Sequence, residues 1–115
     1  MKPIIKVATG TTASISETVG FGNLSSLETW ELDELKLHLS AAATAANTLT
    51  VTQRSHYGSQ YDCKLFSQLM TTVQDLLQQW TRPIKLNGMD RVTVAWTNDA
   101  GADAKTWGLQ INCKA

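Results

Sequence analysis

Strict alternation of apolar and polar residues near the C-terminal end is the feature that most constrains the fold of this chain. Large apolar side chains occupy every second position in residues 92–96 and again in residues 107–113. A repeat of two is typical of a β-strand with one buried face and one solvated face. Pairing Trp96 with Trp107 in an antiparallel register places every large apolar residue on one face. We therefore predict that these strands pair, with residues 98–105 as their loop.

The stretch before these strands contains Asn87-Gly88, a strong short signal for a β-hairpin. A two-residue turn there would direct the apolar positions of residues 92–94 away from those of residues 84–86. The apolar faces stay together only with a wider loop or a bulge over residues 87–91. We expect Gly88 to supply a positive φ within that loop.

Two middle segments, residues 28–40 and 61–70, fit a strand and a helix about equally well by periodicity. The first alternates as a strand does, with one phase slip at Asp33-Glu34, but its leucines also recur at helical spacing. The second alternates at its start, whereas the apolar residues of 65–80 recur at helical spacing. Agreement with the surrounding strands favours strands in both segments, and a helix within 65–80 remains the alternative.

The remaining segments complete an all-β prediction. Residues 48–52 are mostly β-branched and alternating, which predicts a strand. Residues 8–26 are rich in Gly, Ser and Thr, which is typical of an extended arm or of loose edge strands. A chain of 115 residues is long enough for one hydrophobic core. We predict an N-terminal arm over 1–26 followed by a β-domain over 27–115.

Composition and charge narrow the functions that this domain could serve. Apolar residues make up 43% of the chain and charged residues 17%, which argues against a disordered chain. Ten basic residues balance ten acidic ones without a basic cluster, so nucleic acid and an anionic membrane surface are not expected partners. The N-terminal apolar stretch is too short for a signal peptide, and no apolar run could span a bilayer, so we expect a protein made in the cytoplasm.

Catalytic and metal-binding motifs are absent from the sequence, so we expect no enzyme activity, no cofactor and no metal. His38 is interpreted as an outward-facing strand residue. The carboxylates at positions 28, 31, 33 and 34 surround Trp30 and fit a cation or general-acid site, but a charged edge strand explains them better. Asn98, Asp99 and Asp103 carry oxygens that suit calcium, yet they lack the spacing of a calcium loop.

The tryptophans and cysteines each allow two interpretations. Four tryptophans, at positions 30, 80, 96 and 107, could form a platform for sugars, but Trp96 and Trp107 fall in phase with aliphatic residues, which favours a role in the core. Cys63 and Cys113 are expected to be buried thiols, with a disulfide between them as the alternative.

The order of these segments resembles small structural proteins of tailed bacteriophages. The resemblance covers residues 28–113 and depends on these segments: 30–42, 47–52, 61–62, 67–70, 82–86, 92–98 and 105–109. It implies an antiparallel jelly-roll-like β-sandwich that serves as a cement or decoration protein on a capsid. Residues 75–80 depart from the pattern because they have more helix-forming character than a strand.

The resemblance also implies partners. It predicts a protein located in the virion, made in the host cytoplasm, that forms a homo-oligomer, with a trimer favoured, and contacts the major capsid protein. The N-terminal arm would then add a strand to a neighbouring subunit, with Ile4, Ile5 and Val7 as docking residues. An ordinary first strand is the alternative for these three residues. The alternative function is a carbohydrate-binding β-sandwich module of a phage tail or fibre.

Overall fold

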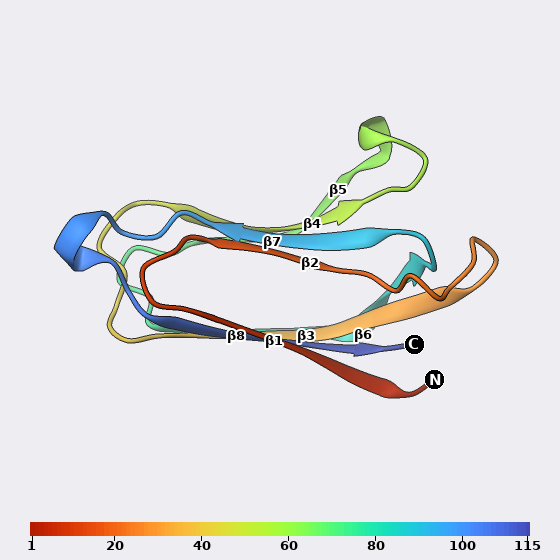
Figure 1. Ribbon diagram of the computed structural model, residues 1–115, viewed down its shortest axis with the longest axis horizontal. Helices are drawn as coiled ribbons and strands as arrows, with labels where there is room; N and C mark the ends of the chain where they lie inside the picture. Colours follow the sequence, from red (N-terminus) through yellow and green to blue (C-terminus); the bar gives the residue numbers. More distant parts are fainter.

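Two four-stranded antiparallel sheets lie face to face in the computed structural model, which describes residues 1–115 (Figure 1). Sheet A contains, in spatial order, β1 (Pro3–Gly10), β8 (Trp107–Lys114), β3 (Thr29–Leu39) and β6 (Asp75–Asn87). Sheet B contains, in spatial order, β2 (Ile15–Val19), β7 (Arg91–Trp96), β4 (Thr48–Arg54) and β5 (Cys63–Leu69). The only helices are two short 3-10 turns, η1 (Ser59–Tyr61) and η2 (Gly101–Asp103), and neither could cross a membrane.

The strand order is that of a jelly roll. β1 pairs with β8, β2 with β7, β3 with β6, and β4 with β5, so each pair encloses the next along the chain. Successive pairs alternate between the two sheets. Pairing of β3 with β8 joins the two pairs of sheet A, and pairing of β4 with β7 joins the two pairs of sheet B. An eight-stranded antiparallel hairpin wrapped in this way forms a jelly-roll sandwich. The predicted all-β, jelly-roll-like sandwich is therefore confirmed.

The alternation seen in the sequence corresponds to the inner faces of the two sheets. In β7 and β8 every second residue is buried, and the core contains 19 buried apolar residues drawn from both sheets. Trp30, Trp96 and Trp107 are all buried among them, while Trp80 packs against the cluster from its margin. The tryptophans are core residues, as the phase of Trp96 and Trp107 predicted.

The predicted segment 28–40 forms one strand, β3 over Thr29–Leu39, with an irregularity at the predicted phase slip. The register of β3 shifts between Leu32 and Glu34 against both of its neighbours. Against β8, Asp33 is the extra residue, because Leu32 pairs with Cys113 and Glu34 with the adjacent Asn112. Against β6 the extra residues are those of β6, because residues 80–83 lie between the partners of Leu32 and Glu34. After a bulge, the side chains that follow change phase relative to the partner strand. Leu32 and Leu35 consequently both face the core, although three positions separate them. This accounts for the helix-like spacing of the leucines.

The predicted pairing of the last two strands is wrong. β7 lies between β2 and β4 in sheet B, whereas β8 lies between β1 and β3 in sheet A. Residues 97–106 cross from one sheet to the other and do not close a hairpin. Alternation shows which face of each strand is buried, but it does not show which strand is its neighbour. The same side chains are buried whether the two strands lie side by side in one sheet or face each other across the core from different sheets.

The N-terminal arm is also a wrong prediction. β1 pairs with β8 over its whole length and β2 pairs with β7, so residues 3–19 belong to the two sheets. Beyond β1, the backbone N–H and C=O groups of Lys2 and Ala115 bond to each other. The Gly, Ser and Thr residues that suggested an arm lie largely in the turns flanking β2, where such residues are common.

Gly88 lies in a connection between the sheets and not in a hairpin loop. The connection from β6 to β7 passes from sheet A to sheet B, and positive φ values occur only at Gly58, Gly101 and Thr72. Gly88 is required for a different reason. Its N–H donates to the Glu28 carbonyl at 2.8 Å, and a Cβ at this position would overlap the Ser25 carbonyl oxygen.

Replacing Gly88 with alanine is therefore expected to destabilise the fold by about 1–3 kcal/mol, the usual range for overpacking against neighbours that cannot move. Urea unfolding monitored by tryptophan fluorescence measures this change. Gly22→Ala is the matched control, because a Cβ at Gly22 meets nothing within 4 Å. Equal stability of the two variants would contradict the steric explanation.

Candidate functional site

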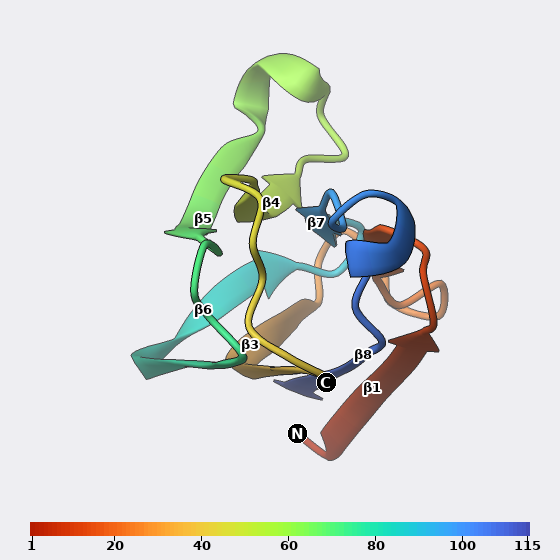
Figure 2. The ribbon, with the colours of Figure 1, turned by 90° about the vertical axis from the view of Figure 1, so that its left-hand side faces the viewer.

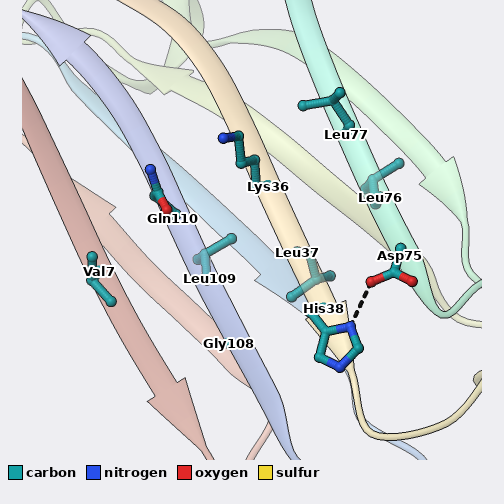
Figure 3. A pocket seen from close by; sticks show the side chains of 10 residues that line it. All are labelled: Val7, Lys36, Leu37, His38, Asp75, Leu76, Leu77, Gly108, Leu109 and Gln110. Atoms are coloured by element: carbon teal, nitrogen blue, oxygen red, sulfur yellow. Dashed lines mark hydrogen bonds and ion pairs between the residues drawn. The ribbon is translucent and has the colours of Figure 1, made fainter.

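A hollow of about 520 Å³ lies on the outer face of sheet A, the face turned away from the core (Figure 3). All four strands contribute to its lining. Ten residues line it: Val7, Lys36, Leu37, His38, Asp75, Leu76, Leu77, Gly108, Leu109 and Gln110. It is the only pocket found in the structure.

The strand registers arrange the outward side chains of this face in rows across the sheet. One row contains Thr9, Gly108, His38 and Asp75, and the next contains Val7, Gln110, Lys36 and Leu77. Gly108 leaves a gap in the first row, and a Cβ placed there would meet nothing within 4 Å. The hollow therefore follows from one residue without a side chain, Gly108, near the start of the central strand β8.

The side chains around the hollow combine both charges with apolar surface. His38 Nδ1 and Asp75 Oδ1 form an exposed hydrogen-bonded pair between β3 and β6 (Figure 3). Lys36 contacts Glu34 at 3.2 Å on the same strand. Val7 and Leu77 stand on the two edge strands with exposed fractions of 64% and 60%. Apolar side chains with a few polar groups among them form a lining whose composition suits binding.

The predicted docking residues all lie on β1. Ile5 and Val7 point outward beside Asn112 and Gln110, and both are more than half exposed. Ile4 is paired with buried Cys113 and points toward the inner side, where 37% of it remains exposed. Of the three residues, only Val7 reaches the hollow. Their role in docking stays a prediction.

The sequence predicted the outward position of His38 on this face but did not predict that of Leu77. The outward position of His38 was predicted and is confirmed by its exposed side chain on β3. Leu77 was missed because an apolar residue on the outer face breaks the alternation of β6 and makes residues 76–80 look helical. The signal in the sequence is that Leu77 is apolar at a position where the alternation of a strand would place a polar residue. This signal can be recognised only when residues 75–87 are already known to form a strand.

A second cluster links the loop between β4 and β5, which projects from the sandwich (Figure 2), to Asp90 in the connection between β6 and β7. The Asp90 carboxylate accepts hydrogen bonds from the side-chain amide of Gln53 at 2.9 Å and from the backbone N–H of His56 at 3.1 Å, and its Oδ1 lies 2.7 Å from His56 Nδ1. Burial raises the pKa of Asp90, but these bonds and the nearby imidazole outweigh burial and lower it. Tyr57 packs on the His56 ring and, like Tyr61, is more than half exposed.

Asn98 and Asp99, two of the three loop residues with oxygens that suit calcium, bond to other parts of the chain, whereas Asp103 is exposed. Asp99 is buried, and its oxygens accept from the Thr44 N–H at 2.8 Å and the Ala45 N–H at 3.0 Å, with the Lys105 ammonium at 3.3 Å. Burial raises the pKa of Asp99, but the donors from Thr44, Ala45 and Lys105 outweigh it and lower the pKa to about 2. Asn98 beside it bonds the backbone of Ala13 and Lys105.

The other acidic residues and the cysteines do not gather into a metal-binding cluster. No group of three or more His, Cys, Asp or Glu residues is placed to hold a metal ion. Glu34 and Asp33 near Trp30 face Lys36 and Lys114, as expected for charges on a strand. Both cysteines are free, so no disulfide forms. Cys113 is buried as predicted, and its burial, followed by the charge of Asp33, raises the thiol pKa to about 12, but Cys63 is exposed.

Searches against protein-family models, curated proteins and solved structures found no match to this chain.

Replacing Asp99 with asparagine is expected to lower the free energy of unfolding by roughly 2–4 kcal/mol, because an amide cannot accept from all the buried donors that face the carboxylate. Because the native pKa is depressed, the contribution of Asp99 is complete above the ordinary aspartate pKa and is lost as the pH falls toward about 2. Between pH 5 and pH 2 the variant should therefore lose less stability than the wild type does. Urea unfolding of both proteins at each pH measures this difference.

Asp103→Asn is the matched control, because Asp103 is exposed in the same crossing segment. It should leave the stability and its pH dependence unchanged. A wild-type pH dependence that survives in full in Asp99→Asn would contradict this assignment.

Proposed function

We propose that this protein is a cement or decoration protein of a bacteriophage virion, which binds the major capsid protein and performs no catalysis. The observation that carries the proposal is the outer face of sheet A, where exposed apolar side chains on both edge strands flank the hollow. Jelly rolls occur in viral capsid proteins but also in lectins and cupins, so the fold alone does not decide the function.

The chemistry of this face favours a protein partner. Ile5, Val7 and Leu77 are each exposed by more than half, and they share one side of one sheet. Polar and charged side chains stand between them, and the whole chain has no net charge. An apolar patch within a polar surround is typical of protein–protein interfaces, whereas a nucleic acid would need an excess of basic residues.

A β-sandwich is suited to holding shell subunits together because its layers do not deform readily. The two sheets share a close-packed core that includes three buried tryptophans. Force applied through one sheet face is then resisted by the whole domain. Docked copies would add interface area between neighbouring capsid subunits and oppose the pressure of the packaged genome. The protein would be made in the host cytoplasm and retained in the virion.

Virions of the phage that encodes the chain test this proposal. Mass spectrometry of purified particles should detect the protein, electron microscopy should place its copies on the shell, and particles stripped of it should rebind it. Leu77→Lys is expected to reduce rebinding at least tenfold, because it places a charge within the docking face. Leu69→Lys is the matched control, since Leu69 is comparably exposed but lies on sheet B. Absence of the chain from the particles would refute the proposal.

Carbohydrate binding is the second candidate, and the projecting β4–β5 loop is the observation in its favour. Trp30 is fully buried and cannot stack on a sugar, but Tyr57 and Tyr61 are exposed by 70% and 63% on that loop. Aromatic faces bind the apolar faces of sugars, and Gln60 and Arg54 nearby offer polar groups. Loss of glycan-array binding in Tyr57→Ala and Tyr61→Ala, with retention in Tyr57→Phe, would support this candidate. An array without any bound glycan would exclude it.

A further inference from the structure

The outer edge of β1 presents backbone groups that no other part of the chain pairs. β1 bonds to β8 on one side only and lies at the margin of sheet A (Figure 2). Lys2 and Ala115 exchange both backbone hydrogen bonds, and the register continues without a shift to Gly10 and Trp107. In an antiparallel ladder, alternate residues bond to the same neighbour. Even-numbered residues of β1 therefore bond to β8, and odd-numbered residues direct their N–H and C=O groups outward.

β1 differs from the other three edge strands of the sandwich. It runs for eight residues in unbroken register with its neighbour, and its one proline, Pro3, is at its first position. β6 contains Pro83 and has a register shift against β3, β5 has a register shift against β4, and β2 is only five residues long. Short, bulged or proline-containing edges resist pairing with another chain, whereas a long regular edge is a template for it.

We infer that two copies of this chain pair antiparallel through their β1 edges about a two-fold axis at Val7. In this register Val7 lies opposite its own counterpart, and Ile5 lies opposite Thr9 of the second copy. All three residues direct N–H and C=O groups outward, so the pair of strands gains about six backbone hydrogen bonds. The edge is thus complementary to itself, as a two-fold interface requires.

Pro3 and Lys6 exclude the neighbouring registers. An axis at Ile5 would place Pro3 opposite Val7, and Pro3 has no N–H to donate. An axis at Lys6 would place two lysines directly opposite each other, which is destabilising. An axis at Ala8 would move Ile5 opposite residue 11, which lies beyond the end of β1. Only the axis at Val7 uses every outward residue of the strand that has both a donor and an acceptor.

The consequence for binding rests on the proposed function. Antiparallel edge pairing extends sheet A into one eight-stranded sheet, and both outer faces remain on the same side because the axis is perpendicular to the sheet. The two hollows would then face one surface together, so a dimer could contact two neighbouring capsid subunits at once. Linked binding sites of this kind increase the overall affinity without any new contact at either site.

Measurement of the mass in solution tests the pairing without any capsid. Sedimentation of the purified protein over a range of concentrations should give twice the monomer mass at the upper end. Val7→Lys should return the mass to that of a monomer, because two lysines would meet at the axis. Leu77→Lys is the matched control, since Leu77 is equally exposed on the opposite edge of the same sheet. It should remain a dimer with the circular dichroism of the wild type.

Cysteine cross-linking tests the register. In a Cys63→Ser background, which removes the exposed native thiol, Val7→Cys should form a disulfide-linked dimer on mild oxidation, because paired residues lie about 5.5 Å apart between Cα atoms. Ile5→Cys should not, because its two copies would be about 14 Å apart along the paired strands. Faster cross-linking of Ile5→Cys than of Val7→Cys would overturn the register.

A monomer or a trimer in solution, or a dimer that Val7→Lys leaves intact, would overturn the pairing. These outcomes are distinct from a failure of the proposed function. Leu77→Lys separates the two, because it is expected to keep the dimer and lose binding to the shell.

Discussion

The crossing between β7 and β8 is the constraint on which the rest of the structure depends. Residues 97–106 carry the chain from sheet B to sheet A, and a fully bonded polar cluster holds them in place. Asp99 joins the crossing to the connection between β3 and β4, and Asn98 joins it to the turn between β1 and β2. Buried polar groups favour one arrangement strongly, because each donor left without a partner is costly. Through this cluster three connections at one end of the sandwich determine where β8 enters sheet A.

The position of β8 in turn determines the outer face of sheet A. β8 lies between β1 and β3, so Gly108 falls between two neighbouring strands and opens the hollow. The bulge at Asp33 shifts the alternation of β3 by one residue. As a result, Lys36 and His38 point outward beside the hollow. The proposed docking face and the proposed pairing edge are therefore both results of one strand order. A change that displaced β8 would remove both surfaces together.

The sequence allowed the class of fold to be predicted, but not its connections. Strands around residues 30, 50, 65, 94 and 110 and the irregularity at Asp33 followed from local alternation, which depends only on which face of a strand is buried. The pairing of Trp96 with Trp107 failed because strand partners are selected by the polar cluster at Asp99, and nothing local to β7 or β8 reports it. The hollow was missed for a similar reason, since its two rows join residues from four strands. Only Val7 among the predicted site residues lies in it.

The enclosed order of strand pairs also bears on how the chain folds. β4 and β5 are joined by the shortest of the connections between paired strands, whereas β1 and β8 are separated by nearly the whole sequence. The entropy lost on closing a loop grows with its length, so local pairs form more readily than distant ones. Folding is then expected to proceed outward from the β4–β5 hairpin and to add β1 last. The regular edge of β1 would thus exist only on a completed sandwich, which limits premature association between chains that are still folding.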